Sequence, residues 1–89
     1  MKFKILIFII TYKASFRVLD LIKKIPFKYL RKHSYTIYAS DDASKDNTIL
    51  YLKQLKRKYK KKLVINENYI NLGYGGNIKK CIRYAYKNK

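Results

Sequence analysis

The sequence predicts an α/β fold with three layers (αβα), in which three parallel strands in the order 3-2-1 are covered by about three helices. Three short apolar segments alternate with three segments whose apolar residues recur every three or four positions. Short connections between alternating strands and helices favour right-handed βαβ units, which build parallel sheets. A chain of 89 residues is long enough for one small domain, so 1–89 is expected to form a single unit.

The first strand is expected at 3–10, and its continuous apolar run of six residues is typical of strands buried on both faces. The run is shorter than the apolar part of a signal peptide and far shorter than a membrane-spanning helix. A helix is expected at 15–25, because Pro26 ends it, and 27–33 forms a short connection with helical character. The apolar stripe of this helix comprises Val18, Leu21, Ile22 and Ile25.

The second strand is expected at 34–40, followed by a helix that runs from Ser44 to about residue 60. Ser44 is a suitable N-cap, and Asp46 would lie in the first turn, where the helix dipole favours negative charge. The third strand is expected at 63–65, and a loop over 66–76 precedes the third helix. The apolar faces of these two helices comprise Ile49, Leu52, Leu55 and Tyr59 in the second, and Ile78, Cys81, Ile82 and Ala85 in the third.

The chain is strongly basic, with 22 Lys and Arg residues against 5 Asp and Glu residues and a formal net charge of +17. Such a charge attracts polyanions, including an anionic membrane surface, although a compositional bias explains lysines that are spread along the chain more simply. One Cys and one His exclude a disulfide framework and a zinc site. We therefore expect a cytoplasmic protein without a signal peptide or transmembrane helix, and peripheral contact with a membrane is compatible with its charge.

Polar residues follow each predicted strand and are expected at one edge of the sheet, because the carboxyl ends of parallel strands meet there. Three of the five carboxylates lie in the stretch 41–48. This acidic loop is explained either by a turn with a helix cap or by a ligand site. Carboxylates in such a place accept hydrogen bonds from a base or from ribose hydroxyls, or they bind Mg²⁺ or Mn²⁺.

Taken together, three segments resemble the N-terminal part of family 2 glycosyltransferases, which have a GT-A fold and include polyprenyl-phosphate sugar transferases. Ile5 to Ala14 is similar to the first strand of the family and its turn. Asp41 to Thr48 is similar to the motif Asp-Asp-x-Ser-x-Asp-x-Thr, and Asn71 to Asn77 to the motif Asn-x-Gly-Tyr-Gly-Gly-Asn. The likeness covers essentially the whole chain, in order, and implies the Rossmann-like, nucleotide-binding half of that fold.

The resemblance implies that the sugar donor is a nucleotide-sugar, with UDP or GDP as its nucleotide, and that it binds at the edge where the strands end. Cys81 replaces a usual Gly, and Ile78 replaces an Arg or Gln of many members, which predicts weaker contacts to the donor. Family enzymes continue into an Asp-x-Asp motif, which holds Mg²⁺ or Mn²⁺, and a catalytic base. Neither is present in 1–89, so this truncated unit is expected not to catalyse alone. The nucleotide-sugar site implied by the family comprises Thr11, Tyr12, Asp41, Asp42, Glu67 and Gly73.

Two expectations about partners follow. Strand order 3-2-1 leaves the apolar first strand at an edge, which predicts self-association or a second polypeptide that supplies the missing half. The alternative function is a small basic nucleic-acid-binding protein that uses Lys56 to Lys62 and the tyrosines. It accounts for the charge but not for the acidic loop, which would repel phosphates, so nucleic acid is the less suitable partner.

Overall fold

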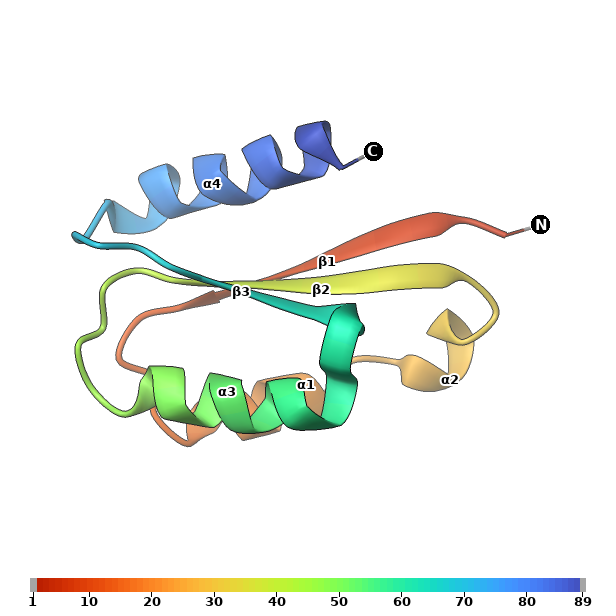
Figure 1. Cartoon of the computed structure of the whole chain (residues 1–89), viewed down its shortest axis with the longest axis horizontal. Coiled ribbons are helices and arrows are strands. Elements are labelled where there is room, and N and C mark those ends of the chain that lie inside the picture. Colours follow the sequence, from red (N-terminus) through yellow and green to blue (C-terminus); the bar gives the residue numbers. More distant parts are fainter. Residues whose placement is uncertain (1, 89) are drawn as a thin grey trace.

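The computed structural model describes residues 2–88 and contains a three-stranded, all-parallel sheet with helices on both faces (Figure 1). The observed strand order β1-β2-β3 is the predicted order 3-2-1 read from the other edge, so the α/β class and the topology are confirmed. The elements are β1 (Lys4–Thr11), α1 (Arg17–Lys23), α2 (Phe27–Leu30), β2 (Ser34–Asp41), α3 (Thr48–Tyr59), the 3₁₀ turn η1 (Lys60–Lys62), β3 (Leu63–Glu67) and α4 (Gly73–Lys87).

The three predicted layers are present. Figure 1 shows α1, α2 and α3 on one face of the sheet and α4 on the other. The main apolar core lies between the sheet and the pair α1 and α3, because the inward side chains of β1 and β2 meet the apolar stripes of these helices there. Its buried residues are Ile9, Val18, Ile22, Ile37, Ala39, Leu52 and Leu63.

The apolar faces of two helices differ from the prediction at one residue each. Leu21 is 40% exposed and Ile82 is 55% exposed, so both were wrongly assigned to the core. The first helix spans only seven residues and buries Val18 and Ile22. The last helix turns Asn77 and Cys81 towards the sheet, which rotates Ile82 away from it. The predicted burial of Cys81 is confirmed.

The starts of α3 and α4 also differ from the prediction. Ser44 is not a helix cap, because α3 begins four positions later, at Thr48. Ala43 and Lys45 have positive φ angles of 58° and 59° and form a turn before the helix. Asp46 also precedes the helix, and its Oδ1 accepts a hydrogen bond of 2.9 Å from the Thr48 amide. Helix α4 starts at Gly73, so the glycines predicted to form a loop lie in its first turn.

The register of the sheet brings the three strand ends together. Thr11 of β1 pairs with Asp41 of β2, and Asp41 pairs with Glu67 of β3. The loops that follow the strands therefore start from one row across the sheet. We call this carboxyl edge, with its loops 11–15, 41–47 and 67–72, the rim. No helix within residues 2–88 has the length and apolar character needed to cross a membrane.

Candidate functional site

A network of buried polar side chains lies at the rim. Burying a polar group is costly unless it is hydrogen-bonded, and within residues 2–88 every buried side-chain nitrogen and oxygen has a hydrogen-bond partner. The rim is therefore an ordered polar structure and not a set of loose surface loops. Its buried polar residues are Thr11, Ser40, Asp41, Asp42, Ser44, Thr48, Asn68 and Asn77.

Asp41 holds the first two rim loops together. Its Oδ1 accepts hydrogen bonds from the hydroxyls of Thr11 (2.7 Å) and Ser44 (2.6 Å), and its Oδ2 accepts one from the Ser44 amide (3.0 Å). Ser44 in turn accepts a hydrogen bond of 2.6 Å from the Lys13 amide. The Asp41 side chain is fully buried, so in this structure its carboxylate orders the rim and is enclosed by protein.

Asp42 joins the acidic loop to the segment that leads into α4. Its Oδ1 accepts hydrogen bonds from the Leu72 amide (2.8 Å) and from Nδ2 of Asn68 (3.0 Å). Its carbonyl accepts a third from Asn71 (3.3 Å). Among the described residues no hydrogen bond reaches Oδ2, and because every buried side-chain oxygen has a partner, this oxygen is open to the surface and can accept a hydrogen bond from a ligand. The predicted meeting of the aspartate pair with the glycine-bearing segment is confirmed by these contacts.

Asparagines fix the start of α4 on the sheet. Nδ2 of Asn77 donates to the Ser40 carbonyl (2.9 Å), and its Oδ1 accepts from the Ser40 hydroxyl and from Asn68. Asn66 donates to the Ser40 hydroxyl (2.9 Å) and to Oδ1 of Asn68 (2.8 Å). Sequence reasoning did not assign these residues to the site. The sequence signals were the motif that ends in Asn77 and the frequency of Asn between 66 and 77, and neither identifies a hydrogen-bond partner.

The other predicted site residues also lie on the rim. Tyr12 is 52% exposed, and Nζ of Lys13 lies 5.3 Å from the centroid of its ring. Glu67 is exposed at the end of β3. Gly73, with a φ of 76°, donates a hydrogen bond of 3.0 Å from its amide to Oδ1 of Asn71. Backbone hydrogen bonds join Thr11, Asp41 and Asp42: the Asp42 amide donates to the Thr11 carbonyl (2.9 Å), and the Asn68 amide donates to the Asp41 carbonyl (2.8 Å). The other three predicted residues lie around them, and within the described chain none of the three donates a hydrogen bond to either carboxylate.

A hollow adjoins the rim where β1 ends. This cavity, of about 430 Å³, is lined by Thr11, Tyr12, Ala14 and Arg17, among others. It lies on the side of α1. A concave space beside an exposed aromatic ring is the usual form of a small-molecule site.

The rim does not fit a divalent metal centre. No group of three or more His, Cys, Asp or Glu side chains that could hold a metal occurs within residues 2–88. Mg²⁺ and Mn²⁺ prefer several oxygen ligands, and the Asp41 carboxylate is enclosed. Asp46 faces solvent, and hydrogen bonds from the Thr48 side chain and amide lower the pKa of its carboxyl. The carboxylates of the rim thus act as hydrogen-bond acceptors, and no metal-dependent step follows from them.

No protein-family model, curated protein or solved structure matches the chain. Its function is therefore inferred from the geometry and chemistry of the rim.

Proposed function

We propose that the rim binds the nucleotide part of a nucleotide-sugar, as the donor-binding unit of a glycosyltransferase of the family 2 type. The observation that carries this proposal is the environment of Asp42. Its side chain is only 4% exposed, one oxygen is held by Leu72 and Asn68, and the other has no donor in the described chain. A fixed, charged acceptor of this kind suits a ligand that offers an N–H group.

The neighbours of Asp42 support a planar ligand. The Asp42 amide donates a hydrogen bond of 2.9 Å to the carbonyl of Thr11, and the exposed ring of Tyr12 follows directly. A stacking ring and a carboxylate acceptor on one rim match a base that stacks and donates from a ring N–H, as uracil and guanine do. Adenine has no N–H within its six-membered ring and is expected to bind less well.

Two lysines that lie among the carboxylates of the rim support the anionic part of the ligand. Lys13 and Lys45 lie on two rim loops, and the Nζ atom of Lys45 is 5.3 Å from the ring centroid of Tyr69. The formal net charge of +17 adds a long-range attraction for a diphosphate. The proposal covers donor binding alone, because no metal centre or catalytic base is assigned among the described residues. Transfer to a polyprenyl phosphate or polysaccharide acceptor is part of the proposal that rests on the family resemblance.

The proposal is tested by calorimetric titration with UDP, GDP and their sugar conjugates, with ADP for comparison and EDTA present. We expect UDP or GDP to bind and ADP to bind more weakly. Asp42→Asn keeps the shape of the side chain but turns an acceptor into an amide, and it should weaken binding by about tenfold or more. Asp46→Asn is the matched control, because it removes the same charge from the same loop at an exposed site.

Two results would contradict the proposal. One is the absence of binding by every nucleotide tested in a protein that is shown to be folded by circular dichroism. The other is an equal loss of affinity in Asp42→Asn and Asp46→Asn, because this would reduce the effect to net charge.

A further inference from the structure

The outer edge of β1 has unpaired backbone groups. The carbonyls of Phe3 and Thr11 accept hydrogen bonds from the amides of Ser34 and Asp42, on the side of β2. Because the direction of backbone groups alternates along a strand, the even-numbered residues of β1 direct their N–H and C=O groups away from the sheet. No other described strand pairs with this edge. These residues are Lys4, Leu6, Phe8 and Ile10.

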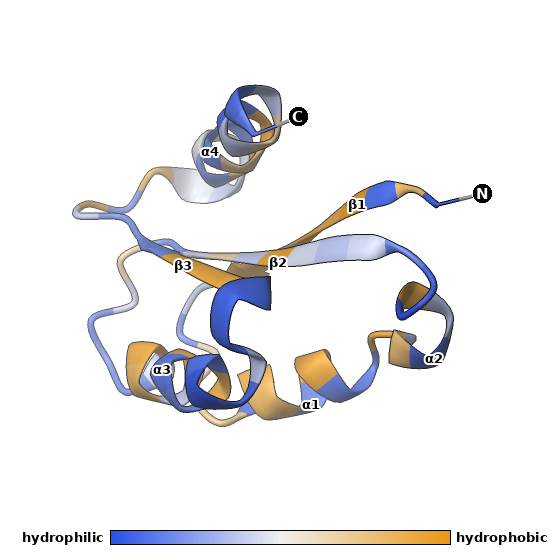
Figure 2. Ribbon diagram, turned by 45° about the vertical axis from the view of Figure 1, so that its right-hand side comes forward, coloured by the Kyte–Doolittle hydropathy of each residue, from blue (hydrophilic) through white to orange (hydrophobic). Residues whose placement is uncertain are grey.

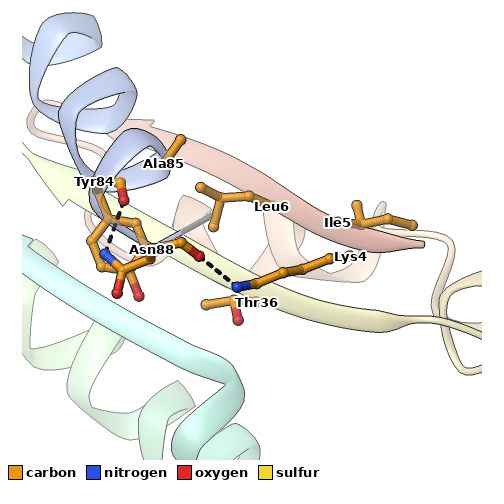
Figure 3. Close-up of a pocket in the computed structure, with 7 residues that line it drawn as sticks. All are labelled: Lys4, Ile5, Leu6, Thr36, Tyr84, Ala85 and Asn88. Carbon is orange, nitrogen blue, oxygen red and sulfur yellow. Dashed lines mark hydrogen bonds between the residues drawn. The ribbon is translucent and has the colours of Figure 1, made fainter. Parts of the chain in front are cut away.

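Three hollows lie along this edge. The first, of about 340 Å³, lies between the start of β1 and the end of α4, where Leu6 and Tyr84 line it together (Figure 3). The second, of about 330 Å³, is lined by Phe8 and Leu21, among others. The third, of about 430 Å³, is lined by Thr11, among others. The first is on the α4 face of the sheet and the other two border α1, so an added strand would find space for side chains on both faces.

The edge is also apolar and only partly covered. Phe8 is 37% exposed and Leu21 is 40% exposed. Figure 2 shows apolar residues along β1. Apolar side chains beside a row of free backbone donors and acceptors are what a peptide meets when it adds a strand to a sheet.

We propose that the β1 edge binds an extended segment of another polypeptide as a fourth strand, with apolar side chains at alternate positions and acidic residues at both ends. Lys4 lies at one end of the edge. Lys24 lines the second and third hollows, and Arg17 lines the third. Asp20 is the only acidic residue that lines these hollows in the described chain. The surplus of positive charge therefore favours acidic ends in the added segment.

A second copy of the chain fits this edge less well. It would bring one charge of +17 against another, and like charges across an interface are costly. Lysine on an edge strand is a common means of preventing pairing between identical edges. The site shares its third hollow, which Tyr12 lines, with the rim, but it uses the free backbone groups of β1 and not the carboxylate of Asp42.

The test uses the whole chain and two synthetic peptides. Both contain alternating Val and Thr over eight residues, the length of β1; one is flanked by pairs of Glu and the other by pairs of Lys. Hydrogen exchange followed by NMR reports the amides of β1 one by one. The Glu peptide should slow exchange at Leu6, Phe8 and Ile10 by about tenfold or more, and it should change the odd-numbered amides much less. The Lys peptide should bind at least about tenfold more weakly.

Two variants test the contacts. Phe8→Pro removes an outward N–H without removing a hydrogen bond to β2, and it should weaken binding of the Glu peptide by about tenfold or more. Phe8→Val, which keeps the N–H, is the matched control and should stay within about threefold of the unmodified chain. Lys24→Glu, at an exposed position, should reduce the preference for the Glu peptide over the Lys peptide.

The proposal is overturned by any of three results. The Glu peptide fails to protect the even-numbered amides, or the Lys peptide binds as tightly, or the even-numbered amides are already protected without peptide and lose this protection on dilution. The last result would identify a second copy as the occupant. If Phe8→Pro does not fold, the exchange pattern of the unmodified chain and the Lys24→Glu variant still decide the question.

Discussion

Thr11 donates a hydrogen bond of 2.7 Å to Oδ1 of Asp41, and the two residues are the last paired positions of β1 and β2. Both side chains are buried, with exposed fractions of 1% and 0%. The link therefore joins two strand ends in a place that water does not reach, where hydrogen bonds to a charged group contribute most. The loops that carry Tyr12 and Asp42 start directly after these two residues.

Removing the Asp41 carboxylate should therefore destabilise the whole domain. Asp41→Ala leaves the Thr11 hydroxyl and the Ser44 hydroxyl and amide without their acceptor, and we expect the free energy of unfolding to fall by about 3 kcal/mol. Thr11→Val, which removes one of the three donors, should cost about 1–2 kcal/mol. Urea unfolding followed by circular dichroism measures both. The control is Asp20→Ala at an exposed position, expected within about 0.5 kcal/mol of the unmodified chain; equal losses in all three variants would contradict this role of Asp41.

Gly76 and Gly75 are neighbours in α4 but should respond in opposite ways to alanine. A Cβ atom at Gly76 would lie 2.8 Å from Cβ of Leu72, whereas a Cβ atom at Gly75 meets nothing within 4 Å. Gly76→Ala should therefore displace Leu72, whose amide holds Asp42, and cost about 1–3 kcal/mol of stability. Gly75→Ala should gain up to about 1 kcal/mol, because alanine is the better helix former.

The same pair of variants tests the link to the site. Nucleotide affinity should fall in Gly76→Ala and stay unchanged in Gly75→Ala when both are titrated calorimetrically with UDP and GDP. Equal affinities in the two variants would show that the position of Leu72 does not influence the ligand site.

Tyr38 should make the domain less stable at alkaline pH. Burial raises the pKa of this phenol, with smaller contributions from Cys81 and Tyr84, and its ring stacks on Tyr84 at a centroid distance of 4.2 Å. The pKa of this phenol is higher in the folded state than in the unfolded state. The contribution of Tyr38 to the free energy of unfolding is therefore fully present below about pH 10 and is lost as pH rises through the raised pKa. Tyr38→Phe should remove this contribution.

The measurement is the difference in unfolding free energy between Tyr38→Phe and the unmodified chain at about pH 8 and about pH 11. All other side chains are the same in both proteins, so the difference isolates Tyr38. At the higher pH, the unfolding free energy of Tyr38→Phe should rise relative to that of the unmodified chain. A difference that stays constant over this range would show that the phenol does not become harder to ionise on folding.

Nucleic acid should bind only as a general polyanion. The charge of +17 attracts RNA, but the acidic loop opposes phosphates at the rim. We expect single-stranded RNA to bind with a Kd above about 1 µM at about 200 mM salt. Fluorescence anisotropy at about 50 mM and about 200 mM salt provides the measurement. Sub-micromolar affinity with a steep salt slope would instead favour the nucleic-acid-binding function over donor binding.

The sequence by itself determined the existence and the order of the strands. The segments predicted at 3–10, 34–40 and 63–65 start within one residue of β1, β2 and β3 and end one or two residues before them, because apolar, β-branched and aromatic residues favour strands. Parallel topology then required polar residues after each strand to share one edge. The position of Asp41 and Asp42 beside Thr11 followed from this rule, before any contact was known.

Tertiary structure alone decided what each rim residue does. Ser44 has the local chemistry of a helix cap, yet it donates to Asp41, and the two aspartates differ in that one is enclosed and the other keeps an unpaired oxygen. The partners that fix these roles are distant in sequence: Asn68 and Asp42 are 26 positions apart, and Asn77 and Ser40 are 37 apart. Local patterns record propensity and periodicity, whereas a hydrogen bond in the rim depends on where other segments of the chain place their donors.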